Sequence, residues 1–260
     1  MAVVLSGSRY RPAPIGDDTL LFMHLPKTGG TALRTAVLQA YGGREVGMVY
    51  GAGELAGAMS REQFQALPAE ELARFDLIVG HFPFGVHRRV TRPSRYVTVV
   101  RDPVERVASL YYHFLNLPGI RFGGKGHRER LRMRLGRTSL ERWVFERQRP
   151  DVDNLMVRNI AGARGVAFGR CTAAMLEQAL TNVDKHFAAL LVTDEMDRSA
   201  LVLEQVVGSP LPAVSRENVN PKRPSLESID ARVQERIRDL NRFDLALYEH
   251  ARSWLLQAAG

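Results

Sequence analysis

The stretch FMHLPKTGGTAL, from Phe22 to Leu33, joins an apolar run to the start of a helical pattern. Glycines in such a loop let backbone N–H groups turn toward an anion at the positive end of the following helix. The hydroxyl groups of Thr28 and Thr31 are expected to add donors. The order differs from the Walker A loop, in which the lysine follows the glycines, because Lys27 precedes Gly29 and Gly30. The stretch predicts a cradle for a phosphate-like group other than the usual triphosphate. A plain glycine turn with a surface lysine is the alternative.

The apolar run before this loop, TLLFMH (19–24), predicts a strand, and three further runs resemble it. They are FDLIVGHF (75–82), RYVTVVRDP (95–103) and AALLVTDEM (188–196), with helical patterns between them. Thr31 is expected to cap the first helix, and Asp102 the helix that begins at Pro103. Because the runs are continuously apolar, the strands should be covered on both faces. The pattern predicts an α/β fold with a P-loop-like, mostly parallel central sheet, flanking helices and a helical C-terminal part.

Polar clusters follow three of the predicted strands: PKTGGT, GHF and RDP. Ligands bind beyond the carboxyl ends of the strands in such sheets, so the three clusters predict one shared site. Arg101 ends a strand and Ser109 lies two turns into the next helix, where a guanidinium and a hydroxyl can clamp a terminal phosphate. The alternative pairs Arg101 with Asp102 or Glu105 and leaves Ser109 as an ordinary helix residue.

HLPKTGGT followed by RDPVERVASLYYHF resembles the two nucleotide-binding motifs of the sulfotransferases that use 3′-phosphoadenosine 5′-phosphosulfate (PAPS). More narrowly, the pair is similar to the carbohydrate branch that contains heparan sulfate 2-O-sulfotransferase. The resemblance covers Phe22 to about Arg252, more weakly through VGHFPFG, DNLMVRNIAG, LLVTDEMDRSALVLEQVVG, NVNPKRPSLES and ALYEHAR. It implies a single sulfotransferase domain over residues 1–260, with a core over about residues 19–257.

In that family the first motif binds the 5′-phosphosulfate and the second binds the 3′-phosphate. The resemblance implies that Lys27 is catalytic and neutralises the departing 5′-phosphate oxygen, and that Arg101 and Ser109 address the 3′-phosphate. The segment NVNPKRPS implies extra contacts from Lys222 and Arg223. The residues implied to bind the nucleotide are Lys27, Thr28, Gly29, Gly30, Thr31, Ala32, Arg101, Ser109, Lys222 and Arg223.

The catalytic base must accept a proton near neutral pH, and histidine fits this need without any pKa shift. The chain has seven histidines: His24, His81, His87, His113, His127, His186 and His250. His81 ends a predicted strand at the ligand-binding edge, in a "GH" context similar to that of the family's catalytic histidine, and is the candidate base. His24 precedes the loop and is the competitor, expected to support the loop instead. His113 is expected to pack, and the other four to lie at the surface.

Composition adds limits on the class of protein. The formal net charge of +8 favours anionic partners. The single cysteine, Cys171, excludes an intrachain disulfide and favours a reducing compartment. No apolar run approaches the roughly 20 residues that span a bilayer; we expect a cytoplasmic protein without a transmembrane segment. An arginine-rich stretch over residues 121–137 either grips an acidic polymer or forms a solvated helix face, with Leu131, Met133 and Leu135 inward.

The sequence as a whole predicts a PAPS-dependent sulfotransferase that acts without a metal by in-line transfer to a hydroxyl acceptor. The acceptor is expected to be a saccharide, and nucleic acid is not expected as a partner. The product nucleotide would be adenosine 3′,5′-bisphosphate. Two rivals stay open: a nucleotide-dependent, kinase-like P-loop enzyme, and a non-catalytic binder of anionic glycans.

Overall fold

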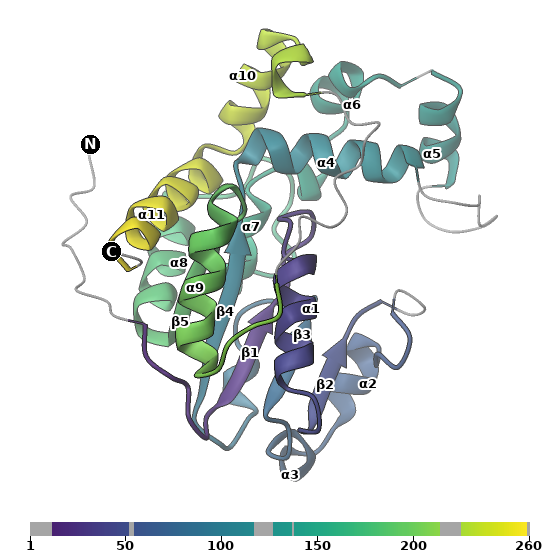
Figure 1. The fold of residues 1–260 in the computed structure, drawn as a ribbon. Coiled ribbons are helices and arrows are strands. Elements are labelled where there is room, and N and C mark those ends of the chain that lie inside the picture. Colours follow the sequence, from purple (N-terminus) through teal and green to yellow (C-terminus); the bar gives the residue numbers. More distant parts are fainter. Residues whose placement is uncertain (1–11, 52–54, 117–126, 137, 214–224, 259–260) are drawn as a thin grey trace.

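The computed structural model describes residues 12–51, 55–116, 127–136, 138–213 and 225–258, and within them a five-stranded, all-parallel sheet (Figure 1). The strand order is β2-β3-β1-β4-β5. The strand bounds are β1 Thr19–Met23, β2 Val46–Val49, β3 Leu77–Gly80, β4 Ser94–Val100 and β5 Phe187–Val192. This confirms the predicted α/β class with a parallel central sheet.

Four strands coincide with the apolar runs, and every residue of β1, β3 and β5 is buried. The continuously apolar runs therefore correspond to strands that are covered on both faces of the sheet, as expected. The strand β2 was not predicted. It is a four-residue edge strand, VGMV, in which buried and partly exposed residues alternate, and Gly47 weakens its strand signal. Its carboxyl end still reaches the same edge as those of its neighbours, since Val49 is paired with Gly80.

Helices cover both faces of the sheet (Figure 1). α1 and α9 contact each other on one face, α7 and α8 pack together on the other, and α11 runs along β5. The bounds of these and the remaining helices are α1 Thr31–Ala40, α2 Arg61–Ala66, α3 Ala69–Leu72, η1 Val86–Arg88, α4 Pro103–Asn116, α5 His127–Arg134, α6 Leu140–Glu146, η2 Pro150–Val152, α7 Leu155–Ile160, α8 Ala173–His186, η3 Thr193–Glu195, α9 Met196–Val207, η4 Leu226–Ser228, α10 Ala231–Leu240 and α11 Arg242–Ala258.

A second apolar cluster lies between α4, α6 and α10, beyond the carboxyl edge of the sheet (Figure 1). Its centre is Trp143, which is fully buried and contacts the ring of Tyr111 at a centroid distance of 5.7 Å. In the arginine-rich stretch, Met133 is buried as expected, but Leu131 and Leu135 are exposed. The expectation of a fully inward apolar stripe was wrong there, because residues two apart on a helix do not share a face.

Two buried caps tie α7 to α11. The side-chain oxygen of Asn154 accepts hydrogen bonds from the N–H groups of Phe243 and Asp244 at the start of α11. In return, the carboxylate of Asp244 accepts from Met156 and Val157 at the start of α7. Each helix thus supplies the acceptor that the other helix's first turn needs.

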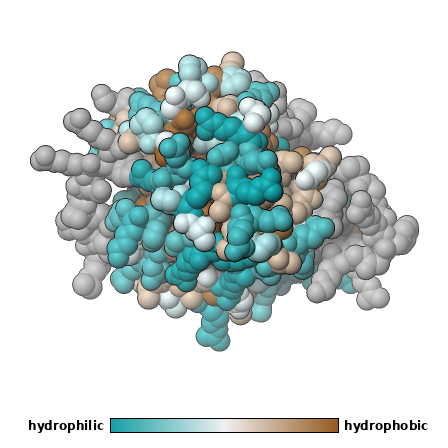
Figure 2. Space-filling model, turned by 90° about the horizontal axis from the view of Figure 1, so that it is seen from below, coloured by the Kyte–Doolittle hydropathy of each residue, from teal (hydrophilic) through white to brown (hydrophobic). Residues whose placement is uncertain are grey.

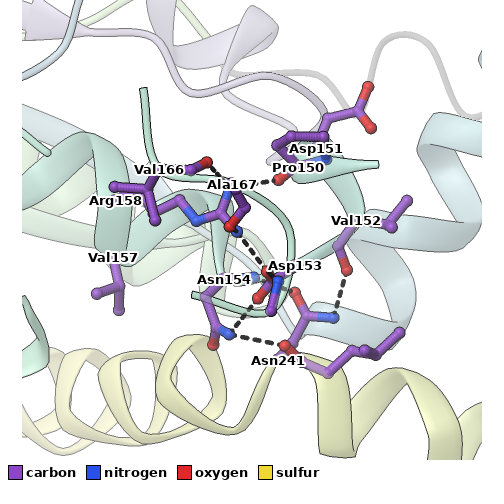
Figure 3. Close-up of polar contacts among 12 residues, drawn as sticks. Pro150, Asp151, Val152, Asp153, Asn154, Val157, Arg158, Val166, Ala167 and Asn241 are labelled. Atoms are coloured by element: carbon purple, nitrogen blue, oxygen red, sulfur yellow. Dashed lines mark hydrogen bonds and ion pairs between the residues drawn. The ribbon is translucent and has the colours of Figure 1, made fainter. Parts of the chain in front are cut away.

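A buried ion pair completes this polar network (Figure 3). Arg158 pairs with Asp153 and also donates to the carbonyl of Pro150 at 3.0 Å. Asn241 donates to the carbonyl of Val152 at 2.8 Å. Since a buried charge is costly unless it is paired and hydrogen-bonded, this network fixes the segment 150–158 in one conformation.

Asn154→Ala is expected to lower the free energy of unfolding by about 2–3 kcal/mol. The variant loses the cap, worth about 1 kcal/mol, and places alanine at a φ of 44°, a left-handed conformation that costs a further 1–2 kcal/mol. Asn154→Gly loses the same hydrogen bonds without the backbone cost and should be about 1 kcal/mol less affected. Urea unfolding measures both. Equal losses in the two variants would contradict the backbone part of this account.

The opposite edge of the sheet, where the strands begin, is seen in Figure 2. It shows mostly hydrophilic residues with apolar ones scattered among them, which is typical of a solvated surface. The concentration of polar groups that the sequence predicts for a ligand lies at the other edge. Within the described residues, no helix combines the length and the apolar character needed to cross a membrane.

Candidate anion-binding site

The loop between β1 and α1 turns through two left-handed residues. Lys27 has a φ of 67° and Gly29 a φ of 75°. For a lysine this conformation costs about 1 kcal/mol or more, and such strain is typical of functional loops. The buried hydroxyl of Thr28 donates to the carbonyl of Leu25 at 2.9 Å. Thr28 therefore offers an anion only its backbone N–H, contrary to the expectation that its hydroxyl would contribute.

Side chains from three other strand ends bind the main-chain carbonyl groups of this loop. His81, after β3, binds the carbonyl of His24. Arg101, after β4, lies 3.5 Å from the carbonyl of Lys27. Thr193, after β5, donates to the carbonyl of Thr28. With these carbonyls held against the protein, the loop's N–H groups are left for a ligand.

Among the described residues, no side chain caps the first turn of α1. Gly30 occupies the N-cap position, so Thr31 is the first helical residue and not the cap that was expected. Since glycine has no side chain to satisfy the first-turn N–H groups, these donors point toward the loop without a cap from the residues that the structure describes. Ala32 is buried in this turn and Thr31 is half-buried. An anion seated here would meet the positive end of the helix.

Gly29 is required by close packing as well as by its backbone angle. A Cβ atom at this position would lie 2.6 Å from Cγ2 of Thr193. The Thr193 hydroxyl also lies 3.1 Å from the carbonyl oxygen of Val100, so its single hydrogen is placed between two acceptors and the side chain cannot move away freely. Thr193 was not predicted, although a polar residue at the end of a predicted strand was a usable signal.

Gly29→Ala is expected to weaken pyrophosphate binding and to lower stability by at least 1–2 kcal/mol, the cost of a left-handed non-glycine residue. The double variant Gly29→Ala/Thr193→Ser removes Cγ2 but keeps the hydroxyl, and it should recover part of both losses. Calorimetry with pyrophosphate and urea unfolding measure the two effects. Failure of the double variant to recover would show that packing against Thr193 is not the constraint.

Two cations are held close to this loop. Burial lowers the pKa of Lys27, and the positive charge of Arg101 lowers it further. Burial also lowers the pKa of Arg101, while the carboxylates of Asp194 and Asp102 raise it. Nearby like charges in a partly desolvated site disfavour each other, and a bound anion relieves that cost. The electrostatics of the loop therefore favour an anionic ligand.

Arg101 already has one carboxylate partner. Its Nη2 lies 2.6 Å from Oε2 of Glu105, and both side chains are 16% exposed. The alternative pairing from the sequence is therefore present, but it does not use the whole guanidinium. Within the described residues, Nε of Arg101 is buried without a hydrogen-bond partner, so its N–H can donate to a bound anion. Ser109 lies one turn beyond Glu105 on α4 and is half-buried, on the same face of the helix.

The cap of α4 matches its prediction. The carboxylate of Asp102 accepts a hydrogen bond from the N–H of Glu105 at 3.0 Å. This bond places the start of α4 beside the end of β4 and holds Glu105 and Ser109 near Arg101. The two candidate motifs are thus brought together at one edge of the sheet.

His81 is held from several sides. Its Nδ1 lies 2.5 Å from the carbonyl of His24. Its ring stacks on that of His24 at a centroid distance of 4.9 Å. A carbonyl can only accept, so Nδ1 carries the hydrogen in this contact, and the neutral ring has its lone pair on Nε2. This is the tautomer that a base acting through Nε2 requires.

His24 is buried and lies beside Gly30, where a Cβ atom would come 3.2 Å from its ring. Burial, and then the charges of His81, Arg34 and Lys27, lower its pKa to about 3. It therefore stays neutral over the range in which a base must work. Its Nδ1 is 3.1 Å from the hydroxyl of Tyr50, which follows the unpredicted strand β2. This supports a structural role for His24, as expected from its place before the loop.

Of the remaining predictions, some concern residues outside the described ranges and others are wrong. Lys222 and Arg223 lie outside the described residues. His113 was expected to pack but is exposed. His87 and His186 were expected at the surface but are partly buried, and their rings contact each other at a tilt, with centroids 4.5 Å apart. They lie near the start of β5, at the edge opposite the candidate site.

Comparison with protein-family models finds no match to this chain, and a search of the curated proteins finds none either. The class of protein is therefore described from the fold and the site alone. The chain is an α/β protein with a candidate anion-binding loop and a histidine at the carboxyl edge of a parallel sheet.

Proposed function

We propose that the protein is a sulfotransferase that moves the sulfuryl group of PAPS to a hydroxyl acceptor, with a saccharide as the expected acceptor. One observation carries the proposal. His81, Arg101 and Thr193 come from three different strand ends, and all bind the main-chain carbonyl groups of the one loop. A candidate base and a candidate phosphate clamp are thereby fixed to the same anion cradle.

The residues present fit a nucleotide with two anionic ends. The open N–H groups at the start of α1 and the side chain of Lys27 suit a 5′-phosphosulfate. The buried Nε of Arg101, which has no partner among the described residues, and the hydroxyl of Ser109 suit a 3′-phosphate. PAPS supplies an activated sulfuryl group, whose sulfur is joined to a good leaving group. This proposal accounts for the position of Lys27 before Gly29 and Gly30. Lys27 would neutralise the oxygen of the sulfur–oxygen bond that breaks, and not bind a terminal phosphate.

The chain's own groups divide the chemistry between them. Nε2 of His81 takes the proton of the acceptor hydroxyl while the acceptor oxygen bonds to sulfur. Lys27 neutralises the negative charge that develops on the 5′-phosphate oxygen as its bond to sulfur breaks. The products are the sulfated acceptor and adenosine 3′,5′-bisphosphate, with the proton left on His81 and then lost to water.

Incubation with labelled PAPS and a panel of saccharides, lipids and small alcohols, followed by mass analysis, tests the proposal. Transfer of label to an acceptor is the expected result. Turnover of ATP without dependence on PAPS would instead support a kinase-like enzyme. Binding of an anionic glycan that leaves PAPS unchanged would support a non-catalytic binder.

Nucleotide preference gives an independent prediction. Adenosine 3′,5′-bisphosphate should bind about tenfold or more tightly than AMP, because one charge-assisted contact to the 3′-phosphate contributes about 1.5–3 kcal/mol. Ser109→Ala removes a donor to the 3′-phosphate and should lower the ratio of the two affinities. The 3′-phosphate must also compete with the Glu105 carboxylate for Arg101, so Glu105→Gln should raise that ratio. Thermal shift and calorimetry with both nucleotides measure this. Equal affinities for the two nucleotides would remove the second motif from the nucleotide site.

A further inference from the structure

Tyr50 is the residue directly after β2, the strand that pairs with β3, and its side chain contacts both His24 and His81. It is 3% exposed. Its hydroxyl is 3.1 Å from Nδ1 of His24. Its ring stands edge-on to the ring of His81, with centroids 4.8 Å apart and an interplanar angle of 73°. One side chain thus contacts the candidate base directly and also holds the residue on which that base is stacked.

These contacts leave the His81 ring little freedom. The ring is stacked on His24 and tied to the His24 carbonyl, with Tyr50 against another side. The first strand contributes His24, the second Tyr50 and the third His81, so no local segment could build this arrangement. Rotation of the imidazole about its Cβ–Cγ bond would break the carbonyl contact and displace Nε2.

Tyr50 is itself held in place. The guanidinium of Arg34, on α1, lies over its ring at 5.6 Å from the centroid. The charges of Arg34 and Lys27 also help to keep His24 neutral, as the lowered pKa of His24 reflects. Neutral His24 can bond to the Tyr50 hydroxyl in either tautomer: Nδ1 accepts the hydroxyl hydrogen when Nε2 is protonated, and Nδ1–H donates to the hydroxyl oxygen otherwise. The cluster is therefore consistent in geometry and in charge.

We propose that Tyr50 is a positioning residue for His81: it fixes the His24–His81 stack so that the lone pair of His81 sits on Nε2 and faces the acceptor. The inference rests on the proposed function, because only in sulfuryl transfer does the acceptor hydroxyl give a proton to His81. Tyr50 itself touches neither the acceptor nor the reacting atoms in this account. Its effect on the rate is expected to pass entirely through His81.

The first test needs no enzymatic activity. Side-chain ¹⁵N spectra distinguish the two neutral tautomers of histidine, and His81→Gln assigns the signals of His81. In the wild type, neutral His81 should carry its hydrogen on Nδ1, and Tyr50→Leu should introduce the Nε2–H form. Tyr41→Phe, at a buried tyrosine beyond the end of α1, is the matched control and should leave the spectrum unchanged. An Nε2–H wild type, or an unchanged spectrum in Tyr50→Leu, would overturn the proposal.

The second test is a double-mutant cycle in single-turnover sulfuryl transfer. Tyr50→Leu should lower the rate roughly 10–10²-fold, as misplacement of a catalytic group does, with unchanged affinity for adenosine 3′,5′-bisphosphate. In the His81→Ala background the same change should have no further effect, because the two residues act as a unit. Tyr50→Phe, which keeps the ring, should fall between Tyr50→Leu and the wild type. Independent, multiplicative losses would show that Tyr50 acts through general structure.

The two tests separate the inference from the function on which it rests. A protein that transfers no sulfuryl group but has the expected tautomer, lost in Tyr50→Leu, would refute the function and keep the positioning of His81. A protein that transfers the group with an unchanged tautomer in Tyr50→Leu would keep the function and refute the role of Tyr50.

Discussion

His81→Ala is expected to lower the single-turnover rate of sulfuryl transfer roughly 10²–10⁴-fold, the contribution of a positioned general base. Affinity for adenosine 3′,5′-bisphosphate should stay close to that of the wild type, because Arg101 and Thr193 still bind the loop's carbonyl groups. The acidic limb of the pH–rate profile, which a base gives as it becomes protonated, should disappear with the side chain. His24 cannot supply that limb, since its pKa is lowered to about 3.

His113→Ala is the matched control, at an exposed histidine on α4. It should leave the rate and the profile unchanged. Because His81 also holds the carbonyl of His24, thermal unfolding of His81→Ala must accompany the kinetics. A near wild-type rate with an intact acidic limb would exclude His81 as the base and direct the search to a carboxylate such as Glu105.

Lys27→Ala should lower kcat by roughly 10²–10³-fold, as loss of one group that stabilises developing charge does. Lys27 lies at the front of the loop, where charge builds on the leaving oxygen only as the bond breaks. A contact made only in the transition state affects kcat more than ground-state affinity.

Lys27→Met separates charge from length, because methionine keeps most of the side chain without the ammonium group. It should behave as Lys27→Ala does. Lys185→Met, at an exposed lysine on α8, is the control and should have no effect. Calorimetry with adenosine 3′,5′-bisphosphate and single-turnover kinetics are compared for each variant. Proportional losses of affinity and rate would make Lys27 a binding residue only.

The four predicted strands, the α/β class and the cap at Asp102 followed from local pattern. A run such as TLLFM is apolar at every position because it is covered on both faces, and that signal needs no knowledge of its neighbours. The same reasoning placed Lys27, His81 and Arg101 at strand ends. In a parallel sheet those ends share one edge, so their approach followed once the strands were predicted.

The details that decide the site's chemistry could not be predicted from local pattern. The strand β2 was missed because it is short and alternating, and Tyr50 was missed with it. The Thr28 hydroxyl and the α1 cap were assigned wrongly, since both depend on which way one loop turns. The sequence also left open whether Arg101 forms an ion pair with a carboxylate of its own chain. The position of α4 decides this, because it brings Glu105 against Arg101.

The sequence by itself determined which residues end the strands and so which side chains can reach the carboxyl edge. It did so because strand and helix periodicity are properties of neighbouring residues. Only the tertiary structure decided that the His24 carbonyl fixes the tautomer of His81, that Thr193 packs against Gly29, and that Tyr50 holds the histidine pair. These contacts join residues far apart in the chain, and their geometry depends on how separate strands align.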